Sequence, residues 1–550
     1  MTEWQFRIII SFFHTLPMAL ADSSYAEVSR KWRSTAKLLF GIDLGELKEY
    51  EKWLGSFRTL RSVRKSSLSG KDIVFSHSHW PKEGEFLLYS EVDFSKKYAP
   101  LDINELKDID SITEAVRERI SYAGGLALGN SHFIERGSGI VDSNYLYNCD
   151  RCAHSKYMAF STMCIYSECM FGVTGSGNSS FLIGGGSNMF CSRCCEASKC
   201  DYVNDSFFVH GCSGCSDCMF SFGLRSKRHA IGNLVLPKEK YLAIKAKLLS
   251  EMGEGLLKSK RLPTIIEIVS SAKPDYAPMK KAMAAMPPQP PPKKDTRQIE
   301  DSFSSACNVV LGKPRASIAK HEKWLLRNVN PTEDCTSCAS GRKVILPEHT
   351  RFMLFPRDRL LALDESFFLG EALTINEKEA NGISMQNAAK TISKVAYFCP
   401  DWEMGNSSNL VDCVVGINSN SCMKCILPIN SKLCSAYYWP RDSEHLHGGN
   451  EVRSSSFCIS CFHSEKLTRC FEVDSSNSCS GCYFCHNCEN VHDSMFCFNV
   501  KNMKNAIGNV ELPREKYLEI KSRVLAEINS QLDKSSEVKQ SIFSLAARKK

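Results

Sequence analysis

Residues Asn477–Cys497 read NSCSGCYFCHNCENVHDSMFC, and their first four cysteines follow a strict spacing of three residues. A shorter run with the same spacing occurs earlier in the chain, in the stretch VHGCSGCSDCMF. The first run contains Cys479, Cys482, Cys485 and Cys488, and the second contains Cys212, Cys215 and Cys218. The same cysteine pattern therefore appears twice in one chain.

The composition is that of a folded protein with an unusual amount of cysteine. The chain has 550 residues, 27 cysteines and a formal charge of +8. An odd number of cysteines cannot pair completely within one chain, and Cys-x-x-Cys pairs suit metal binding or packing better than a disulfide framework. We therefore expect a reducing, cytoplasmic location. The small net charge permits nucleic-acid binding without requiring it.

The N-terminal stretch Ile8–Ala21, IIISFFHTLPMALA, offers an alternative to the cytoplasmic location because it resembles the core of a signal peptide. The match is poor because Glu3 cancels Arg7, and because His14 and Pro17 interrupt the apolar run. A buried N-terminal helix and a signal peptide both stay open here. The stretch is too short and too polar to span a membrane.

The sequence is also repeated internally. Glu51–Leu54, EKWL, recurs as Glu322–Leu325. Ala230–Met252, which begins AIGNLVLPKEKYL, matches Ala506–Ile528, which begins AIGNVELPREKYL, at a slightly larger offset along the chain. We interpret the chain as a tandem duplication whose two copies are separated by a stiff, proline-rich linker centred on Pro287–Lys294.

Each copy contains the same order of parts. A lead helix precedes short β segments, which include Phe86–Ser90 and Arg351–Phe355, and a second helix follows at Ser111–Tyr122 or Ile383–Phe398. Short apolar runs then alternate with Ser, Asn, Asp and Gly, which is typical of a β-solenoid. A closing helix is expected to begin at Pro237 or Pro513, because proline is tolerated at a helix start.

The predicted fold class is mixed α and β: a tandem duplication in which a lead α+β region precedes a Cys-rich β-solenoid closed by a C-terminal capping helix. The expected boundaries are an N-terminal helical segment at 1–40, a lead region at 41–130, a solenoid with its capping helix at 131–262, a linker at 263–306, the second lead region at 307–406, the second solenoid with its capping helix at 407–532, and a basic tail at 533–550.

This combination of features resembles a group of large, cysteine-rich proteins of small-genome bacteria and archaea. The resemblance is carried by the Ser69-Gly70-Lys71 turn, the cysteine-punctuated solenoid, the Cys-x-x-Cys-x-x-Cys run and the closing Lys-Glu-Lys-Tyr segment. It implies a zinc-ribbon-like knuckle followed by a Cys-rich β-repeat, and it implies nothing about activity. Copy one departs from the knuckle, since Arg64 and Ser67 stand where copy two has Cys335 and Cys338.

Three interpretations of the cysteines stay open. Two Cys-x-x-Cys halves form the usual tetrahedral zinc site, so the runs at Cys479–Cys488 and Cys212–Cys218, and the knuckle at Cys335 and Cys338, are candidate metal ligands. An iron–sulfur run is a second interpretation, although the last spacing is two residues rather than three and no proline follows Cys488. The third interpretation is packing, because cysteine is a small and often buried residue.

The sequence contains no strong catalytic signature. It has no Walker A motif, no H-E-x-x-H and no G-x-S-x-G. We therefore expect a non-enzymatic structural or interaction protein, a duplicated scaffold that binds a protein or other macromolecular partner and for which zinc is the candidate cofactor. Two alternatives are an RNA- or ribonucleoprotein-binding zinc protein, suggested by lysine-rich flanks, and an iron–sulfur or other metal-dependent enzyme.

Overall fold

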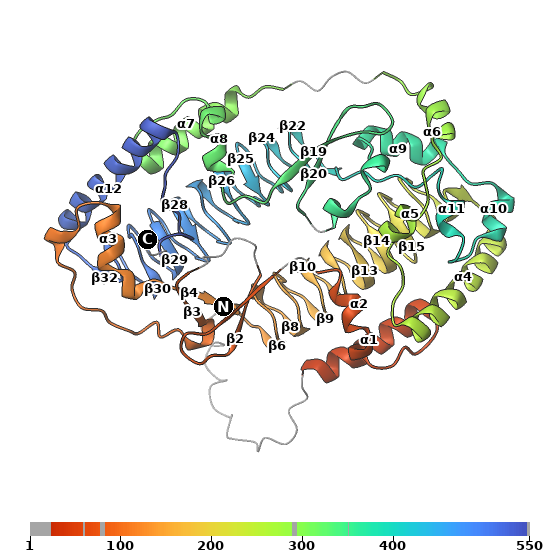
Figure 1. Ribbon diagram of the computed structural model, residues 1–550, viewed down its shortest axis with the longest axis horizontal. Coiled ribbons are helices and arrows are strands. Elements are labelled where there is room, and N and C mark those ends of the chain that lie inside the picture. Colours follow the sequence, from red (N-terminus) through yellow and green to blue (C-terminus); the bar gives the residue numbers. More distant parts are fainter. Residues whose placement is uncertain (1–23, 59–60, 77–82, 289–293, 350, 547–550) are drawn as a thin grey trace, which may run out of the picture.

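The computed structural model describes residues 24–58, 61–76, 83–288, 294–349 and 351–546. The described chain is mixed α and β, with 12 α-helices and many short strands. Two ladders of strands lie next to each other, and helices run along their outer edges (Figure 1). The signal-like stretch Ile8–Ala21 and residues 289–293 of the predicted linker lie outside the described residues, whereas the described part of the linker contains helices at Ile265–Ser270 and Tyr276–Met283 and the start of a helix at Arg297. No described helix is both long and apolar enough to cross a bilayer.

The first ladder, which we call the first stack, covers residues 127–235. Its strands are β5 (Ala127–Leu128), β6 (His132–Glu135), β7 (Ile140–Val141), β8 (Asn144–Tyr147), β9 (Lys156–Ala159), β10 (Thr162–Ile165), β11 (Glu168–Phe171), β12 (Thr174–Gly177), β13 (Ser180–Met189), β14 (Ser192–Ser198), β15 (Phe207–His210), β16 (Ser216–Met219), β17 (Arg228–Ile231) and β18 (Leu234–Val235).

The second stack covers residues 403–511. Its strands are β21 (Glu403–Met404), β22 (Ser408–Val411), β23 (Gly416–Ile417), β24 (Asn420–Met423), β25 (Ser435–Tyr438), β26 (Glu444–Asn450), β27 (Ser456–Ile459), β28 (Thr468–Asp474), β29 (Tyr483–Glu489), β30 (Phe498–Lys501), β31 (Ala506–Ile507) and β32 (Val510–Glu511).

Most strand pairs in both stacks share one register. The parallel partners, such as Leu146 with Met158 in the first stack and Cys458 with Cys470 in the second, have a sequence separation of 12, the same as the hydrogen-bonded pair Ser155 and Ser167. We call the segment between one residue and its parallel partner a coil. Successive pairs begin at Ser138, Val141 and Asn144, so consecutive sides of a coil pair with the matching sides of the next coil.

The backbone turns at every third residue. Residues 142, 145, 148 and 151 all have positive φ, and the pattern continues through both stacks. A left-handed residue at this interval bends the chain, so each coil has four sides of three residues. Asn, Asp and Gly accept this conformation most readily, which explains the regular turn-forming residues in the sequence.

One residue on each side of a coil points inward and stacks on its equivalents in adjacent coils. The interior of the first stack contains Leu146, Cys149, Cys152 and Met158, and the interior of the second contains Cys458, Cys461, Cys470 and Val473. Cysteine, serine and valine are common in this interior, which also holds longer side chains such as Leu446 and Tyr437, and in a close-packed core each position tolerates little change in volume.

The helices surround the stacks. They are α1 (Ser24–Phe40), α2 (Glu51–Gly55), α3 (Ile109–Ala115), α4 (Lys238–Ser259), α5 (Ile265–Ser270), α6 (Tyr276–Met283), α7 (Arg297–Leu311), α8 (Ile318–Leu325), α9 (Leu363–Ala372), α10 (Glu377–Gly382), α11 (Ala388–Thr391) and α12 (Arg514–Ser535). Helices α4 and α12 begin directly after Pro237 and Pro513, the positions expected from the sequence, and each buries one apolar stripe.

The lead regions contain short strands, and one segment that was predicted to be a strand is a turn. The strands are β1 (Ser62–Lys65), β2 (Asp72–Phe75), β3 (Glu85–Leu88), β4 (Ser121–Gly124), β19 (Thr332–Thr336) and β20 (Lys343–Pro347). Residues Arg351–Phe355, predicted as a strand, contain a 3₁₀ turn at Phe352–Leu354. The rings of Phe352 and Phe355 contact each other, with centroids 5.1 Å apart, so a turn places both on one apolar side.

The predicted helix Ser111–Tyr122 is also shorter than expected. Helix α3 ends at Ala115, and Ser121–Gly124 forms β4, which pairs in parallel with β3. The predicted helix Ile383–Phe398 is wrong in a similar way, since only α11 is helical within it. In both regions the chain leaves the helical conformation where it reaches the stack of the other half.

The end of each lead region packs against the stack of the other half of the chain. The backbone N–H of Ala123 donates to His486 Nε2 at 3.0 Å in the second stack. The N–H of Cys399 donates to His210 Nε2 at 3.1 Å in the first stack. The offset from Ala123 to Cys399 and from His210 to His486 is the same as that from Ala230 to Ala506. The two halves therefore exchange equivalent contacts.

Candidate functional site

The four cysteines of the opening stretch form one complete coil. Because each side of a coil has three residues, Cys479, Cys482, Cys485 and Cys488 supply the inward residue of four successive sides. Their thiols donate to backbone carbonyls: Cys479 Sγ lies 3.3 Å from the oxygen of Asn477 and 3.5 Å from that of Cys488. The spacing of three thus follows from the geometry of the coil.

The cysteines also form columns along each stack. Cys458, Cys470 and Cys482 occupy equivalent positions in successive coils, and Ser494 continues the column. Cys212 follows Cys200 in the same way, while Cys215 and Cys218 belong to two other columns of the first stack. A column of this kind is the arrangement that packing requires. The sequence could have revealed it, because cysteine recurs at the period of one coil.

The pKa values of the candidate thiols move in both directions. Burial raises the pKa of Cys488 well above the usual value for a thiol, whereas hydrogen bonds with neighbouring cysteines lower the pKa of Cys215 and, against the effect of burial, that of Cys485. A protonated thiol donates a hydrogen bond, whereas zinc binds the thiolate. None of the 27 cysteines, all within the described ranges, forms a disulfide.

The knuckle residues lie elsewhere. Cys335 belongs to β19 and Cys338 to the turn that joins β19 to β20, and both are half-buried. Cys335 Sγ lies 3.4 Å from Glu333 Oε1. In the part of the chain that the structure describes, no group of three or more His, Cys, Asp or Glu side chains is arranged to hold a metal ion. The zinc site therefore stays a prediction without a matching ligand geometry.

A pair of surface grooves is the strongest candidate for a functional site. The first groove runs along one corner of the first stack and has a volume of about 580 Å³. The second runs along a corner of the second stack, with a volume of about 610 Å³. The first is lined by Asp142, Asn144, His154, Ser155, Lys156, Tyr166, Ser167, Glu168, Asn178, Ser179 and Ser180. The second is lined by Asn418, Asn420, Asn430, Ser431, Lys432, Asp442, Ser443, Glu444, Ser454, Ser455 and Ser456.

Every lining residue of one groove has its counterpart in the other, at the same offset that relates Ala230 to Ala506. Seven of the eleven pairs are identical: Asn144/Asn420, Ser155/Ser431, Lys156/Lys432, Ser167/Ser443, Glu168/Glu444, Ser179/Ser455 and Ser180/Ser456. Since this offset is a whole number of coils, both grooves lie at the same corner of their stacks.

A column of serines makes the floor of each groove. In the first groove the N–H of Ser167 donates to Ser155 Oγ at 3.1 Å, and the N–H of Ser179 donates to Ser167 Oγ at 3.3 Å. The second groove repeats this pattern, with the N–H of Ser455 donating to Ser443 Oγ at 3.1 Å. Serine is small and its hydroxyl bonds the backbone, so this corner is indented and its backbone groups are hydrogen-bonded.

One ion pair lines each groove at the same place. Lys156 Nζ lies 3.0 Å from Glu168 Oε2, and Lys432 Nζ lies 2.9 Å from Glu444 Oε2. In both pairs the lysine and glutamate are partners across adjacent coils. Each pair is largely exposed, so it contributes little to the stability of the fold. Within each pair, the charge of the lysine balances that of the glutamate.

The two grooves differ along one wall. In the first groove the rings of His154 and Tyr166 stack in parallel with centroids 4.7 Å apart, and Tyr166 is 59% exposed. In the second groove the equivalent residues are Asn430 and Asp442, joined by a hydrogen bond of 2.9 Å. The first groove therefore has an aromatic wall and the second a polar one.

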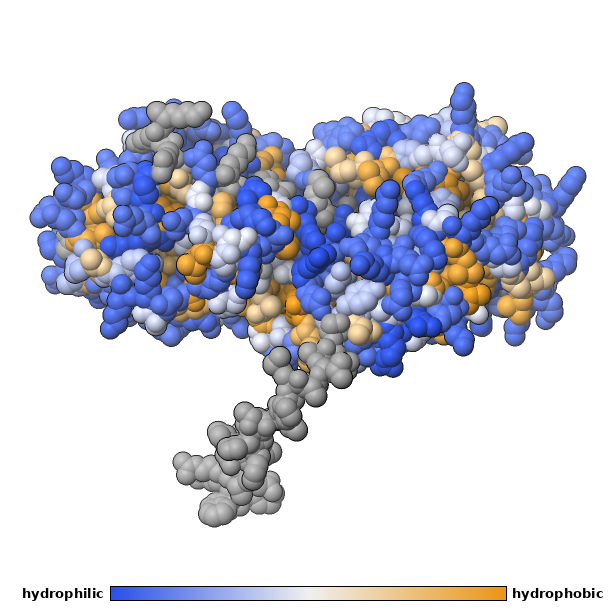
Figure 2. All heavy atoms as spheres, turned by 60° about the horizontal axis from the view of Figure 1, so that its bottom comes forward, coloured by the Kyte–Doolittle hydropathy of each residue, from blue (hydrophilic) through white to orange (hydrophobic). Residues whose placement is uncertain are grey.

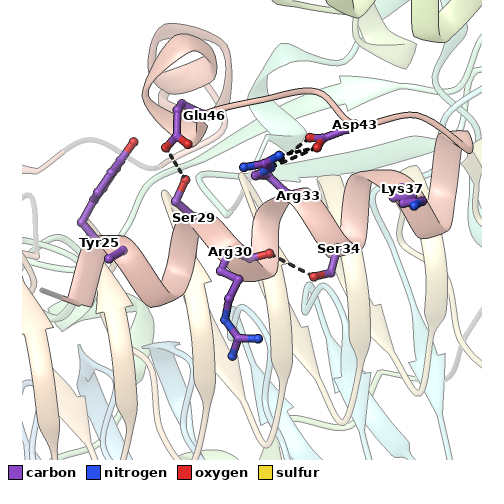
Figure 3. A pocket seen from close by; sticks show the side chains of 9 residues that line it. Tyr25, Ser29, Arg30, Arg33, Ser34, Lys37, Asp43 and Glu46 are labelled. Atoms are coloured by element: carbon purple, nitrogen blue, oxygen red, sulfur yellow. Dashed lines mark hydrogen bonds and ion pairs between the residues drawn. The ribbon is translucent and has the colours of Figure 1, made fainter. Parts of the chain in front are cut away.

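A third depression, of about 490 Å³, lies on α1 (Figure 3). Figure 3 shows Ser29 and Arg33 pointing toward the segment that carries Asp43 and Glu46. Arg33 Nη2 lies 2.5 Å from Asp43 Oδ2, and Ser29 Oγ donates to Glu46 Oε2 at 3.0 Å. Since these groups bond each other, the depression offers few groups to a ligand.

The remaining surface has no dominant apolar area in the view of Figure 2, where hydrophilic residues cover most of the face and hydrophobic ones are scattered. The grooves were not among the sites predicted from the sequence. Their signal was present in the serines at 131, 143, 155, 167 and 179, which recur once in every coil, and in the equivalent column of the second half.

Comparison with known proteins adds no assignment. No protein-family model matches the chain, and neither a curated protein nor a solved structure shows detectable similarity to it.

Proposed function

We propose that this is a non-enzymatic interaction protein, a duplicated scaffold whose two stacks present equivalent grooves to a macromolecular partner. In this proposal each stack is a β-solenoid, the two halves arose by tandem duplication, and α4 and α12 are capping helices. The parallel register, the left-handed residue at every third position and the constant offset between equivalent residues support it.

The observation that carries the proposal is the recurrence of the groove. Wall residues of a stack are exposed and can vary with little effect on stability. Yet Asn144, Lys156 and Glu168 have identical counterparts in the second stack, as do the serines between them. Binding of the same partner would require both halves to keep the same exposed wall residues. Packing of the stack requires only that the buried floor serines are kept.

Two grooves in one chain also favour a large or repetitive partner. When one groove is occupied, the second binds from a high effective concentration, provided that the partner spans both sites. We propose a cytoplasmic location because the 27 cysteines are free thiols, most of them buried, and thiols persist in a reducing compartment. Nucleic acid is the weaker candidate, because each groove offers only one lysine and that lysine is paired with glutamate.

The test compares the wild type with two variants of the full chain. The groove variant carries Lys156→Ala, Glu168→Ala, Lys432→Ala and Glu444→Ala, which removes both ion pairs without changing the net charge. The control variant carries Glu489→Ala and Lys501→Ala, another ion pair between partners in adjacent coils, with its atoms 2.6 Å apart, outside both grooves.

Each immobilised protein is incubated with an extract of the cells that produce it. We expect a macromolecule that the wild type and the control variant retain equally, and that the groove variant retains at least about tenfold less, a loss of about 1.4 kcal/mol in binding. Equal retention by all three proteins, or no retained macromolecule, would reject the proposal.

A further inference from the structure

We propose that each groove binds a segment of an uncharged, hydroxyl-rich polysaccharide chain. This inference rests on the proposed function and names the chemical class of the partner. It follows from the polarity of the lining, from its repetition along the stack and from the difference between the two walls.

The polarity of the lining fits a neutral ligand rich in hydroxyl groups. Of the residues that the two grooves share, two per groove form the lysine–glutamate pair, an asparagine and a serine lie at the wall, and three are the floor serines, which are buried and bonded to the backbone. Hydroxyl and amide groups both donate and accept hydrogen bonds, as sugar hydroxyls do. Each groove carries one carboxylate outside the lysine–glutamate pair, Asp142 or Asp442, which disfavours an anionic polymer, and an apolar peptide would find no apolar floor.

The lining repeats with the coils, which suits a polymer. Asn144, Lys156, Glu168 and Ser180 occupy one position in four successive coils, and Ser155, Ser167 and Ser179 occupy the position before it in three of them. Adjacent paired strands lie about 4.8 Å apart, a distance comparable to the length of one sugar ring. A chain lying along the groove would therefore meet polar groups at each of its units.

The aromatic wall distinguishes the first groove. Tyr166 is exposed beside the groove and is held by its stacking on His154. A sugar ring has apolar C–H faces as well as hydroxyl edges, and an aromatic side chain with a polar tip offers contacts to both. The second groove has Asp442 at this position. The first groove should therefore bind the polymer more tightly than the second.

The experiment uses the full chain and three insoluble, uncharged probes: cellulose, chitin and a (1→3)-β-glucan. We expect retention on at least one of them, resistant to high salt. The groove variant should lose at least about tenfold in affinity, and the Glu489→Ala/Lys501→Ala control should lose none. Tyr166→Ala should weaken retention more than its counterpart Asp442→Ala. Circular dichroism and the melting temperature establish that each variant is folded.

Three outcomes would overturn the inference. The first is absence of retention on all three polysaccharides, and the second is equal retention by the wild type and the folded groove variant. The third is binding to heparin or to polyuridylic acid that salt abolishes, without binding to the uncharged probes. If the polysaccharides fail while the extract still yields a groove-dependent protein, the inference falls and the proposed function stands. If both experiments fail, both fall.

Discussion

At the scale of single residues, the neighbours of each inward position decide which side chain the interior of a stack accepts there. An inward residue has to fit between its equivalents in the coils above and below, and a polar one has to bond a backbone carbonyl. Cys482 meets both conditions, since its Sγ lies 3.2 Å from the carbonyl oxygen of Val491 and its column continues at Ser494. Thiol and hydroxyl groups can therefore occupy the same column.

Substitution of Cys482 separates packing from metal binding. We expect Cys482→Leu to overfill the interior and lower the free energy of unfolding by about 1–3 kcal/mol, and Cys482→Ser to cost less because the hydroxyl keeps the hydrogen bonds. Urea denaturation measures both. Treatment of the wild type with EDTA should leave the melting temperature unchanged. A released zinc ion accompanied by a lower melting temperature would instead establish metal ligation.

Two buried histidines link stability to pH. Burial lowers the pKa of His447 to about 3, with His445 acting in the same direction, and burial lowers the pKa of His349 to about 3, aided by the charge of Arg151. In the unfolded chain the pKa of histidine is about 6.5. Between these values only the unfolded state gains a proton, so stability is complete above about pH 6.5 and decreases as the pH falls toward about 3.

The wild type should therefore lose about 1.4 kcal/mol of unfolding free energy per pH unit for each of these histidines below about pH 6. Urea denaturation at pH 7 and pH 5 measures this slope. We expect His447→Gln to flatten the slope while its amide bonds the neighbouring serines. His132→Gln, which changes an exposed histidine, should keep the wild-type slope. A wild-type stability equal at both pH values would contradict the assignment.

At the scale of the element, the coil depends on a left-handed residue at every third position. Residues with positive φ include aromatic and charged ones, such as Tyr166 and Arg469, as well as Asn and Gly. Each bend has a conformational cost, and the hydrogen bonds between coils offset it. A β-branched residue raises that cost most, because its side chain clashes with the backbone in this conformation.

Arg469 offers a matched test, because it is exposed and has a φ of 56°. We expect Arg469→Val to be about 1–2 kcal/mol less stable than Arg469→Asn, since asparagine accepts the left-handed conformation and both changes remove the same charge. Urea denaturation of the two variants gives the difference. Equal stabilities would mean that the bend does not limit the choice of residue.

At the scale of the whole molecule, the two halves hold each other through the exchanged ends of their lead regions. Tyr122 is buried against His486 and Phe498 of the second stack, and Phe398 packs on His210 of the first. The side chain of Arg119 donates to the carbonyl oxygen of Gly508. Each stack therefore completes its core with residues from the other half of the chain.

Cleavage of the chain between the halves tests this exchange. A protease site is placed between residues 288 and 294 of the full chain, and the cleaved protein is analysed by gel filtration. We expect both fragments to elute together at the position of the uncut protein, because each buries apolar residues of the other. Tyr122→Asp with Phe398→Asp should separate them. Fragments that part without these substitutions would refute the exchange.

The sequence by itself determined the local features. The recurrence of EKWL and of the AIGN segment predicted where equivalent elements lie, and Pro237 and Pro513 predicted the starts of α4 and α12, because proline at a helix start is a local preference. Local reasoning failed at Ser111–Tyr122 and Ile383–Phe398, where contacts with residues far away in the chain outweigh helical propensity.

Only the tertiary structure decided how these local features are combined. Residues three apart lie on successive sides of one coil, and residues 12 apart lie above one another along the axis of the stack. The four cysteines of the metal-like motif therefore belong to four different columns of inward side chains. The tertiary structure also brought Ala123 to His486 and aligned the serines that form the grooves. The physical reason is that backbone pairing between coils and contacts between the halves set these arrangements, and neither leaves a recognisable pattern within a short stretch of sequence.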